Sequence, residues 1–160
     1  MKKFIFLFFI IGTTPLFCQN LISIGNKNYP CTKTYSMGGH SEDLKILFAK
    51  KEIDKLIVFE LPFKIKGDAQ LLLENGTKIE LLDKGLYDSI NVNRILYYFS
   101  NQDISNLKVS NINYIRYPVV SIDKTILYFT VQNVDKKSDD IFVNDFKRVN
   151  FCSIISEFFK

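Results

Sequence analysis

The stretch KLIVFELPFKI, residues 55–65, carries the strongest structural signal in the chain. Its large apolar residues occupy every second position: Ile57, Phe59, Leu61, Phe63 and Ile65. Glu60 and Lys64 lie between them, and this period of two is typical of a β-strand with one buried face. Pro62 has no backbone N–H for a neighbouring strand, so we expect this strand to lie at a sheet edge or to bulge there.

Further strand signals lie on both sides of this stretch. Leu44, Ile46 and Phe48 alternate with a polar residue and predict a preceding strand. The stretch QLLLENGTKIELL predicts a hairpin over residues 70–82. Asn75-Gly76 is expected to form its two-residue type I′ turn, because both residues tolerate positive φ. Short strands within 20–42 and three longer ones, at about 89–99, 111–120 and 124–132, complete the predicted sheet.

Two segments favour helices. Ser100 and Asp103 form a capping-box pattern that predicts a short helix between two of the strands. Near the C-terminus, apolar residues recur every three or four positions, which predicts an amphipathic helix over about 139–159 with Ser138-Asp139-Asp140 at its start. We therefore expect an α+β fold. It would be a mostly antiparallel sheet of about six to eight strands, with one short helix and a C-terminal amphipathic helix packed on it.

The N-terminus has the pattern of a secretory signal peptide. Met1-Lys2-Lys3 supplies positive charge, residues 4–11 (FIFLFFII) are all apolar, and Pro15 lies in the helix-breaking stretch that follows. The apolar run is much shorter than the roughly 20 residues of a membrane-spanning helix. We predict a signal peptide at 1–18 and a single β-rich domain at 19–160, exported to the periplasm or the extracellular space. The mature chain would have no transmembrane helix.

Cys18 ends the predicted leader and raises the alternative of a lipoprotein anchored through this residue. Lipidation requires a small residue directly before the cysteine, whereas Phe17 stands there, and Pro15 occupies a position that is usually aliphatic. We therefore favour simple cleavage, after Cys18 or after Gln19, without a lipid anchor.

Removal of Cys18 would leave Cys31 and Cys152 as an even pair in an exported protein, a composition that favours a disulfide. Cys152 lies on the apolar stripe of the predicted C-terminal helix, and Cys31 shares strand parity with Tyr29 and Tyr35. A bridge between them would close a loop of roughly 120 residues and stabilise the fold by about 4–5 kcal/mol in the chain-entropy model. The alternative is two buried free thiols that pack as small apolar groups.

The sequence lacks a convergent catalytic or metal-binding constellation, so we predict no catalytic residues, no metal site and no cofactor. His40 is the single histidine and lies in a glycine-rich loop near Glu42 and Asp43, which is a weak pattern for a metal site. No serine-nucleophile elbow, phosphate-binding glycine loop or paired-cysteine zinc motif occurs.

The charge pattern argues against a nucleic-acid partner. The net charge of +4 falls to +2 without Lys2 and Lys3 of the leader, and the remaining lysines are interleaved with acids. Arg116 lies among tyrosines in YIRYPV, residues 114–119. We interpret it as one member of a cross-strand pair rather than as a base-contacting residue.

The chain resembles small uncharacterised exported proteins of the Bacteroidetes. The resemblance lies in the Phe-rich leader ending at Cys18-Gln19, in ISNLKVSNINYIRY (104–117) and in VNFCSII (149–155). It implies an exported protein with a short helix, an Ile-Arg strand and a cysteine-bearing C-terminal helix. That group has no assigned activity, so the resemblance implies no site.

Together these features favour an exported, non-enzymatic domain that acts by contact with an unknown protein partner or as a cell-envelope component. An inhibitor or immunity-like protein would be a more specific form of this hypothesis, and the binding residues remain unassigned. One alternative is a small periplasmic hydrolase with unrecognised catalytic residues, either carboxylates or a Cys–His pair. The other is a glycan-binding module that uses sheet tyrosines: Tyr97, Tyr98, Tyr114, Tyr117 and Tyr128.

Overall fold

The centre of the fold is a hairpin formed by β4 (Leu44–Lys51) and β5 (Asp54–Glu60), with Ile46 opposite Phe59. This computed structural model describes residues 20–24, 27–38, 44–88, 93–134 and 148–160. β5 ends before Pro62, so the strand expected over 55–65 is shorter than predicted. It pairs with neighbours on both sides and is not an edge strand, which corrects that expectation. Because Pro62 lies beyond the ladder, its missing N–H costs no sheet hydrogen bond.

Six strands form the first sheet, in the order β1-β2-β4-β5-β8, with β3 also paired to β4. Cys31 of β2 lies opposite Ala49, and Met37 of β3 lies opposite Leu44, so both strands follow the same edge of β4. The bounds of the remaining strands are Asn20–Ile24 for β1, Lys27–Cys31 for β2, Tyr35–Met37 for β3 and Arg94–Tyr98 for β8.

Four strands form the second sheet, in the order β10-β9-β6-β7. Their bounds are Ala69–Leu73 for β6, Lys78–Leu81 for β7, Ile112–Val120 for β9 and Ile126–Gln132 for β10. All strand pairs in both sheets are antiparallel, as predicted. The ten described strands exceed the six to eight expected, because the polar segment after residue 20 forms three short strands.

The β6–β7 hairpin forms where it was predicted, but its turn is of another type. The N–H of Gly76 donates to the carbonyl of Leu73, and the N–H of Leu73 donates to the carbonyl of Thr77. These bonds enclose a three-residue loop in which Gly76 has φ 83°. Only glycine takes positive φ without strain at such a position, so Gly76 supports a type I turn with a following bulge rather than a type I′ turn.

Helix α1 (Asn101–Val109) confirms the predicted short helix, including the capping box between Ser100 and Asp103. Helix α2 covers only Phe151–Phe158, and 148–150 are not helical, so the predicted start was wrong. The side chain of Asn150 caps α2 by accepting the N–H of Ser153 at 3.0 Å. The expected cap at 138–140 lies outside the described residues. Neither described helix is long and apolar enough to span a membrane.

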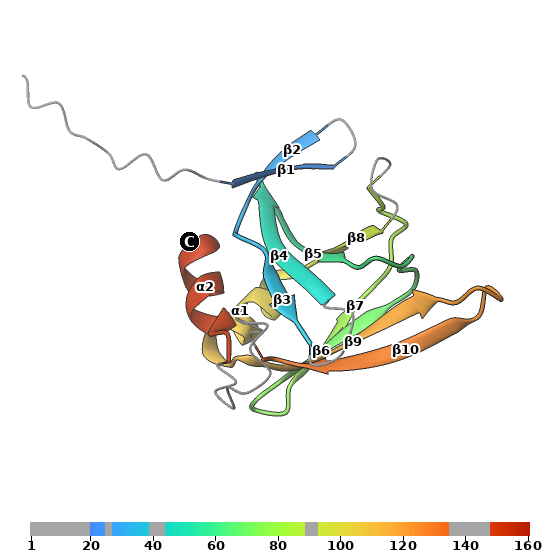
Figure 1. Cartoon of the computed structure of the whole chain (residues 1–160). Helices are drawn as coiled ribbons and strands as arrows, with labels where there is room; N and C mark the ends of the chain where they lie inside the picture. Colours follow the sequence, from blue (N-terminus) through green and yellow to red (C-terminus); the bar gives the residue numbers. More distant parts are fainter. Residues whose placement is uncertain (1–19, 25–26, 39–43, 89–92, 135–147) are drawn as a thin grey trace, which may run out of the picture.

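The main core lies between the two sheets, and α1 and α2 close one side of it (Figure 1). Phe48 and Tyr97 of the first sheet, Leu71 of the second sheet and Phe151 of α2 are all completely buried there. A second, smaller cluster covers the opposite face of the first sheet and includes Cys31 and Leu56. Both faces of β5 are therefore buried, and the protein has the α+β, mostly antiparallel architecture expected from its sequence.

Candidate functional site

The two cysteines of the described chain are free thiols, so the expected Cys31–Cys152 disulfide is absent from the structure. Cys31 is buried, and desolvation raises its pKa, which makes the thiol less reactive. α2 faces the surroundings of Cys31 with Ile154 and Phe158. Cys152 lies two residues before Ile154, which is a rotation of about 200° around the helix axis. Its side chain therefore points away from Cys31. Its Sγ instead donates to the carbonyl of Lys108 in α1 at 2.7 Å.

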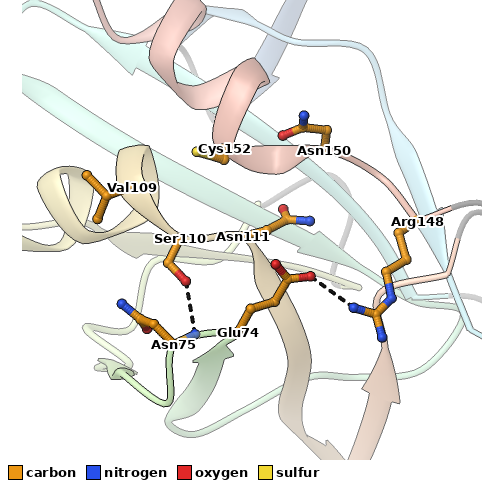
Figure 2. A pocket seen from close by; sticks show the side chains of 8 residues that line it. All are labelled: Glu74, Asn75, Val109, Ser110, Asn111, Arg148, Asn150 and Cys152. Atoms are coloured by element: carbon orange, nitrogen blue, oxygen red, sulfur yellow. Dashed lines mark hydrogen bonds and ion pairs between the residues drawn. The ribbon is translucent and has the colours of Figure 1, made fainter.

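Cys152 borders an open polar pocket of about 660 Å³ between the β6–β7 turn, the end of α1 and the start of α2 (Figure 2). Arg148 forms an ion pair with Glu74 at 2.9 Å across this pocket. The N–H of Asn75 donates to Ser110 Oγ at 3.1 Å. These polar groups bind one another, and their contacts connect the β6–β7 turn to α1 and to the segment before α2.

His40, Glu42 and Asp43 lie outside the described residues. Within the described ranges, no three His, Cys, Asp or Glu side chains gather closely enough to hold a metal ion. The pocket in Figure 2 contains a thiol but no histidine among its lining residues.

The tyrosines considered for glycan binding do not form one exposed platform. Tyr97 is completely buried in the first sheet, where its hydroxyl donates to the carbonyl of Gly67 at 2.8 Å. Tyr117 is also buried, in the second sheet, and only Tyr128 is about half exposed. The guanidinium of Arg116 lies over the Tyr128 ring at 4.5 Å, which confirms the cross-strand interpretation of Arg116.

The strongest candidate for a binding site is an apolar groove, here called the hairpin groove, along the β9–β10 hairpin. Its volume is about 780 Å³. Phe63, Leu127 and Phe129 line it with exposed fractions of 41%, 48% and 47%, so large apolar side chains face solvent together. The other lining residues are Leu61, Tyr117, Val119, Val120, Ser121, Ile122 and Asp123.

The alternation of β10 explains how the groove forms. Leu127, Phe129 and Val131 share the face that points toward the first sheet, because side chains alternate along a strand. Val131 is covered, with only 9% exposed, whereas Leu127 and Phe129 lie nearer the hairpin tip and stay open. Figure 1 shows this hairpin, in orange, extending beyond the strands of the first sheet. Phe129 stacks on Tyr117 at a centroid distance of 6.1 Å, which holds its ring in the groove.

Asp123 lies at the tip of the hairpin and gives the groove one acidic rim residue. Hydrogen bonds from the side chains of Ser121 and Thr125, followed by the N–H of Thr125, lower the pKa of Asp123 to about 2. The carboxylate is fully ionised at neutral pH and fixes the geometry of the tip.

This geometry predicts an unusually acidic titration for Asp123. Its stabilising effect on the hairpin tip should be complete above the unfolded pKa, near 4, and should be lost as the pH falls toward 2, because protonation removes the acceptor. NMR titration of the carboxyl carbons would measure this. In Ser121→Ala the pKa should rise toward its ordinary value, and an unchanged midpoint would show that Ser121 is not the main cause.

No binding residue was assigned from the sequence, and the hairpin groove was not predicted. A usable signal was present in the run Ile126-Leu127-Tyr128-Phe129, four consecutive large apolar residues in a strand. A strand with one face in solvent is expected to alternate, so an unbroken run indicates that both faces contact something.

No family model matches the chain, and no curated protein or solved structure is significantly similar to it. The function must therefore be inferred from the groove itself.

Proposed function

We propose that the protein is an exported, non-enzymatic interaction domain that binds an apolar segment of a partner protein in the hairpin groove. The observation that carries this proposal is the exposure of Phe63, Leu127 and Phe129 along one groove. Monomeric soluble domains rarely leave large contiguous apolar patches open unless the patch binds something. Aromatic side chains are also enriched at the centres of protein interfaces.

The leader at 1–18 supports a location in the periplasm or outside the cell, with cleavage near Cys18 and no lipid anchor. An inhibitor or immunity-like protein, or a structural component of the envelope, would use such a groove without chemistry of its own.

An apolar partner segment fits better than a glycan, because glycans require several polar contacts and the groove is lined mostly by aliphatic and aromatic side chains.

Replacing Phe63 with lysine should weaken partner binding strongly. Phe63 lies after β5, outside the β9–β10 ladder, and its ring is 41% exposed, so a lysine there should leave the fold intact. The change places a charge among apolar side chains and should weaken binding by roughly 30-fold, the loss expected at a central interface residue worth about 2 kcal/mol. Affinity capture from the cell envelope, followed by titration of the captured protein, would measure this.

Ile53→Lys is the matched control, because Ile53 is an apolar residue that is 89% exposed in the β4–β5 turn and does not line the groove. The same partner should bind wild type and Ile53→Lys equally well and should bind Phe63→Lys roughly 30-fold more weakly. Equal retention by Phe63→Lys, with circular dichroism confirming that both variants are folded, would exclude the groove as the binding site.

A further inference from the structure

β10 is an edge strand of the second sheet, and among the described residues only β9 pairs with it. The hydrogen bonds at the two ends of the hairpin determine which backbone groups remain on the free side. The N–H of Ser121 donates to the carbonyl of Thr125, and the N–H of Asn133 donates to the carbonyl of Asn113. In an antiparallel ladder the bonded pairs alternate, so the odd-numbered residues of β10 bond to β9. The even-numbered residues direct their N–H and C=O groups to the free edge: Ile126, Tyr128, Thr130 and Gln132.

This edge lacks the features that usually prevent strand addition. Ile126–Gln132 contains no charged residue and no proline, and its first five residues are exposed. The opposite edge strand of the same sheet, β7, carries Lys78 and Glu80 on its exposed positions. Charged residues and proline are the common protection of sheet edges, and their absence over seven residues leaves β10 open to a further strand.

We infer that the occupant of this edge is β10 of a second copy of the chain, paired antiparallel about a two-fold axis. When all seven residues of β10 pair with the seven residues of the partner's β10, Phe129 lies opposite the partner's Phe129 and Tyr128 lies opposite the partner's Thr130. In this register every outward N–H and C=O of the four even-numbered residues meets a complementary group, because both residues of each pair are even-numbered. A two-fold contact uses the same patch on both copies, which is the commonest symmetry among soluble oligomers.

Charge does not oppose a second copy in this position. Arg116 lies on β9 opposite Thr130, and Pro118 lies opposite Tyr128. The cross-strand row that contains Arg116 would therefore run from Arg116 through Thr130 and the partner's Tyr128 to the partner's Pro118. No row contains two cations, and neither central strand contains any charge, so the arrangement has no like-charge contact.

The dimer would also enlarge the hairpin groove. With the two-fold axis perpendicular to the sheet, Leu127 and Phe129 of both copies lie on the same face. The two grooves then join into one apolar trough across the axis. This consequence rests on the proposed function, whereas dimerisation itself does not.

Cysteine cross-linking tests the register. In Phe129→Cys the two new thiols would face each other in a non-hydrogen-bonded pair, where Cβ atoms lie about 4.5–5.5 Å apart, close enough for a disulfide after a small adjustment. Mild oxidation of the full mature chain should give a covalent dimer. Leu127→Cys is the control, because Leu127 lies opposite the partner's Val131, and wild type reports any cross-linking through Cys31 or Cys152. Cross-linking of Leu127→Cys equal to that of Phe129→Cys, or none in Phe129→Cys, would overturn this register.

Sedimentation equilibrium tests the dimer. Wild type should show a concentration-dependent dimer, and Thr130→Pro should weaken it at least tenfold, since it removes an outward N–H without breaking a bond to β9. Thr130→Val keeps that N–H and should dimerise like wild type. A monomeric wild type at all concentrations, or an unaffected Thr130→Pro, would refute the proposal. Phe63→Lys should remain dimeric, so loss of the dimer and loss of partner binding are separable results.

Discussion

Replacing Phe151 with alanine is expected to lower the free energy of unfolding by about 3–5 kcal/mol, the usual range for a fully buried phenylalanine. Phe151 is the first residue of α2 and is completely buried. Its ring makes edge-to-face contacts with Phe48 of β4, at 5.7 Å, and with Tyr35 of β3, at 5.5 Å. An isolated helix of eight residues is not stable in water, so α2 depends on this packing.

Phe158→Ala is the matched control on the same helix. Phe158 is half-buried and lies beneath the ammonium group of Lys50 at 4.9 Å. Its removal should cost roughly 1–1.5 kcal/mol, about half of what full burial of such a side chain contributes. Urea unfolding followed by far-UV circular dichroism would compare the two variants. Equal losses would show that α2 is not anchored mainly through Phe151.

Replacing Asn133 with alanine is expected to destabilise the protein by about 1–3 kcal/mol, although it removes only a polar side chain. Asn133 is completely buried. Its amide group donates to the carbonyls of Ile112 and Val149, both at 2.8 Å, and its oxygen accepts the N–H of Val149 at 3.1 Å. The carbonyl of Val149 keeps a second donor in Asn111. The substitution would therefore leave at least the N–H of Val149 without its side-chain partner, and each such buried group costs about 1–3 kcal/mol.

Asn101→Ala provides the comparison, because Asn101 is exposed and accepts a hydrogen bond from Lys55 at 2.7 Å. That hydrogen bond is exposed to solvent, and its loss should change the free energy of unfolding by no more than about 0.5 kcal/mol. Thermal unfolding of both variants should separate them clearly. A similar small effect for Asn133→Ala would mean that water replaces the lost hydrogen bonds.

Asn133 and Asn111 also explain why the last helix starts later than its sequence pattern suggests. Asn111 accepts the N–H of Phe151 at 2.9 Å and donates to the carbonyl of Val149 at 3.1 Å. Both backbone groups of Val149 are thus held by side chains from the ends of β9 and β10. This arrangement fixes a non-helical segment before Phe151. No local sequence pattern indicates that these asparagines bind the backbone before α2, because their hydrogen-bond partners are 16 to 40 residues away.

The sequence by itself determined the features that depend on near neighbours in the chain. Alternation at Ile57 and Phe59 predicts a strand, Ser100 with Asp103 predicts a capped helix, and Asn75-Gly76 predicts a hairpin, because each signal acts within a few residues. These features together define an antiparallel α+β protein, and the structure confirms it.

Only the tertiary structure decided which surfaces are covered. Cys31 and Cys152 fit a disulfide by parity and count, but α2 turns Cys152 toward α1 and leaves both thiols free. The alternating residues of β10 fit a buried face, yet the hairpin extends past the first sheet, so Phe129 stays open while Val131 is covered. Burial depends on how far one sheet overlaps another, and that overlap is set by packing between residues far apart in the sequence.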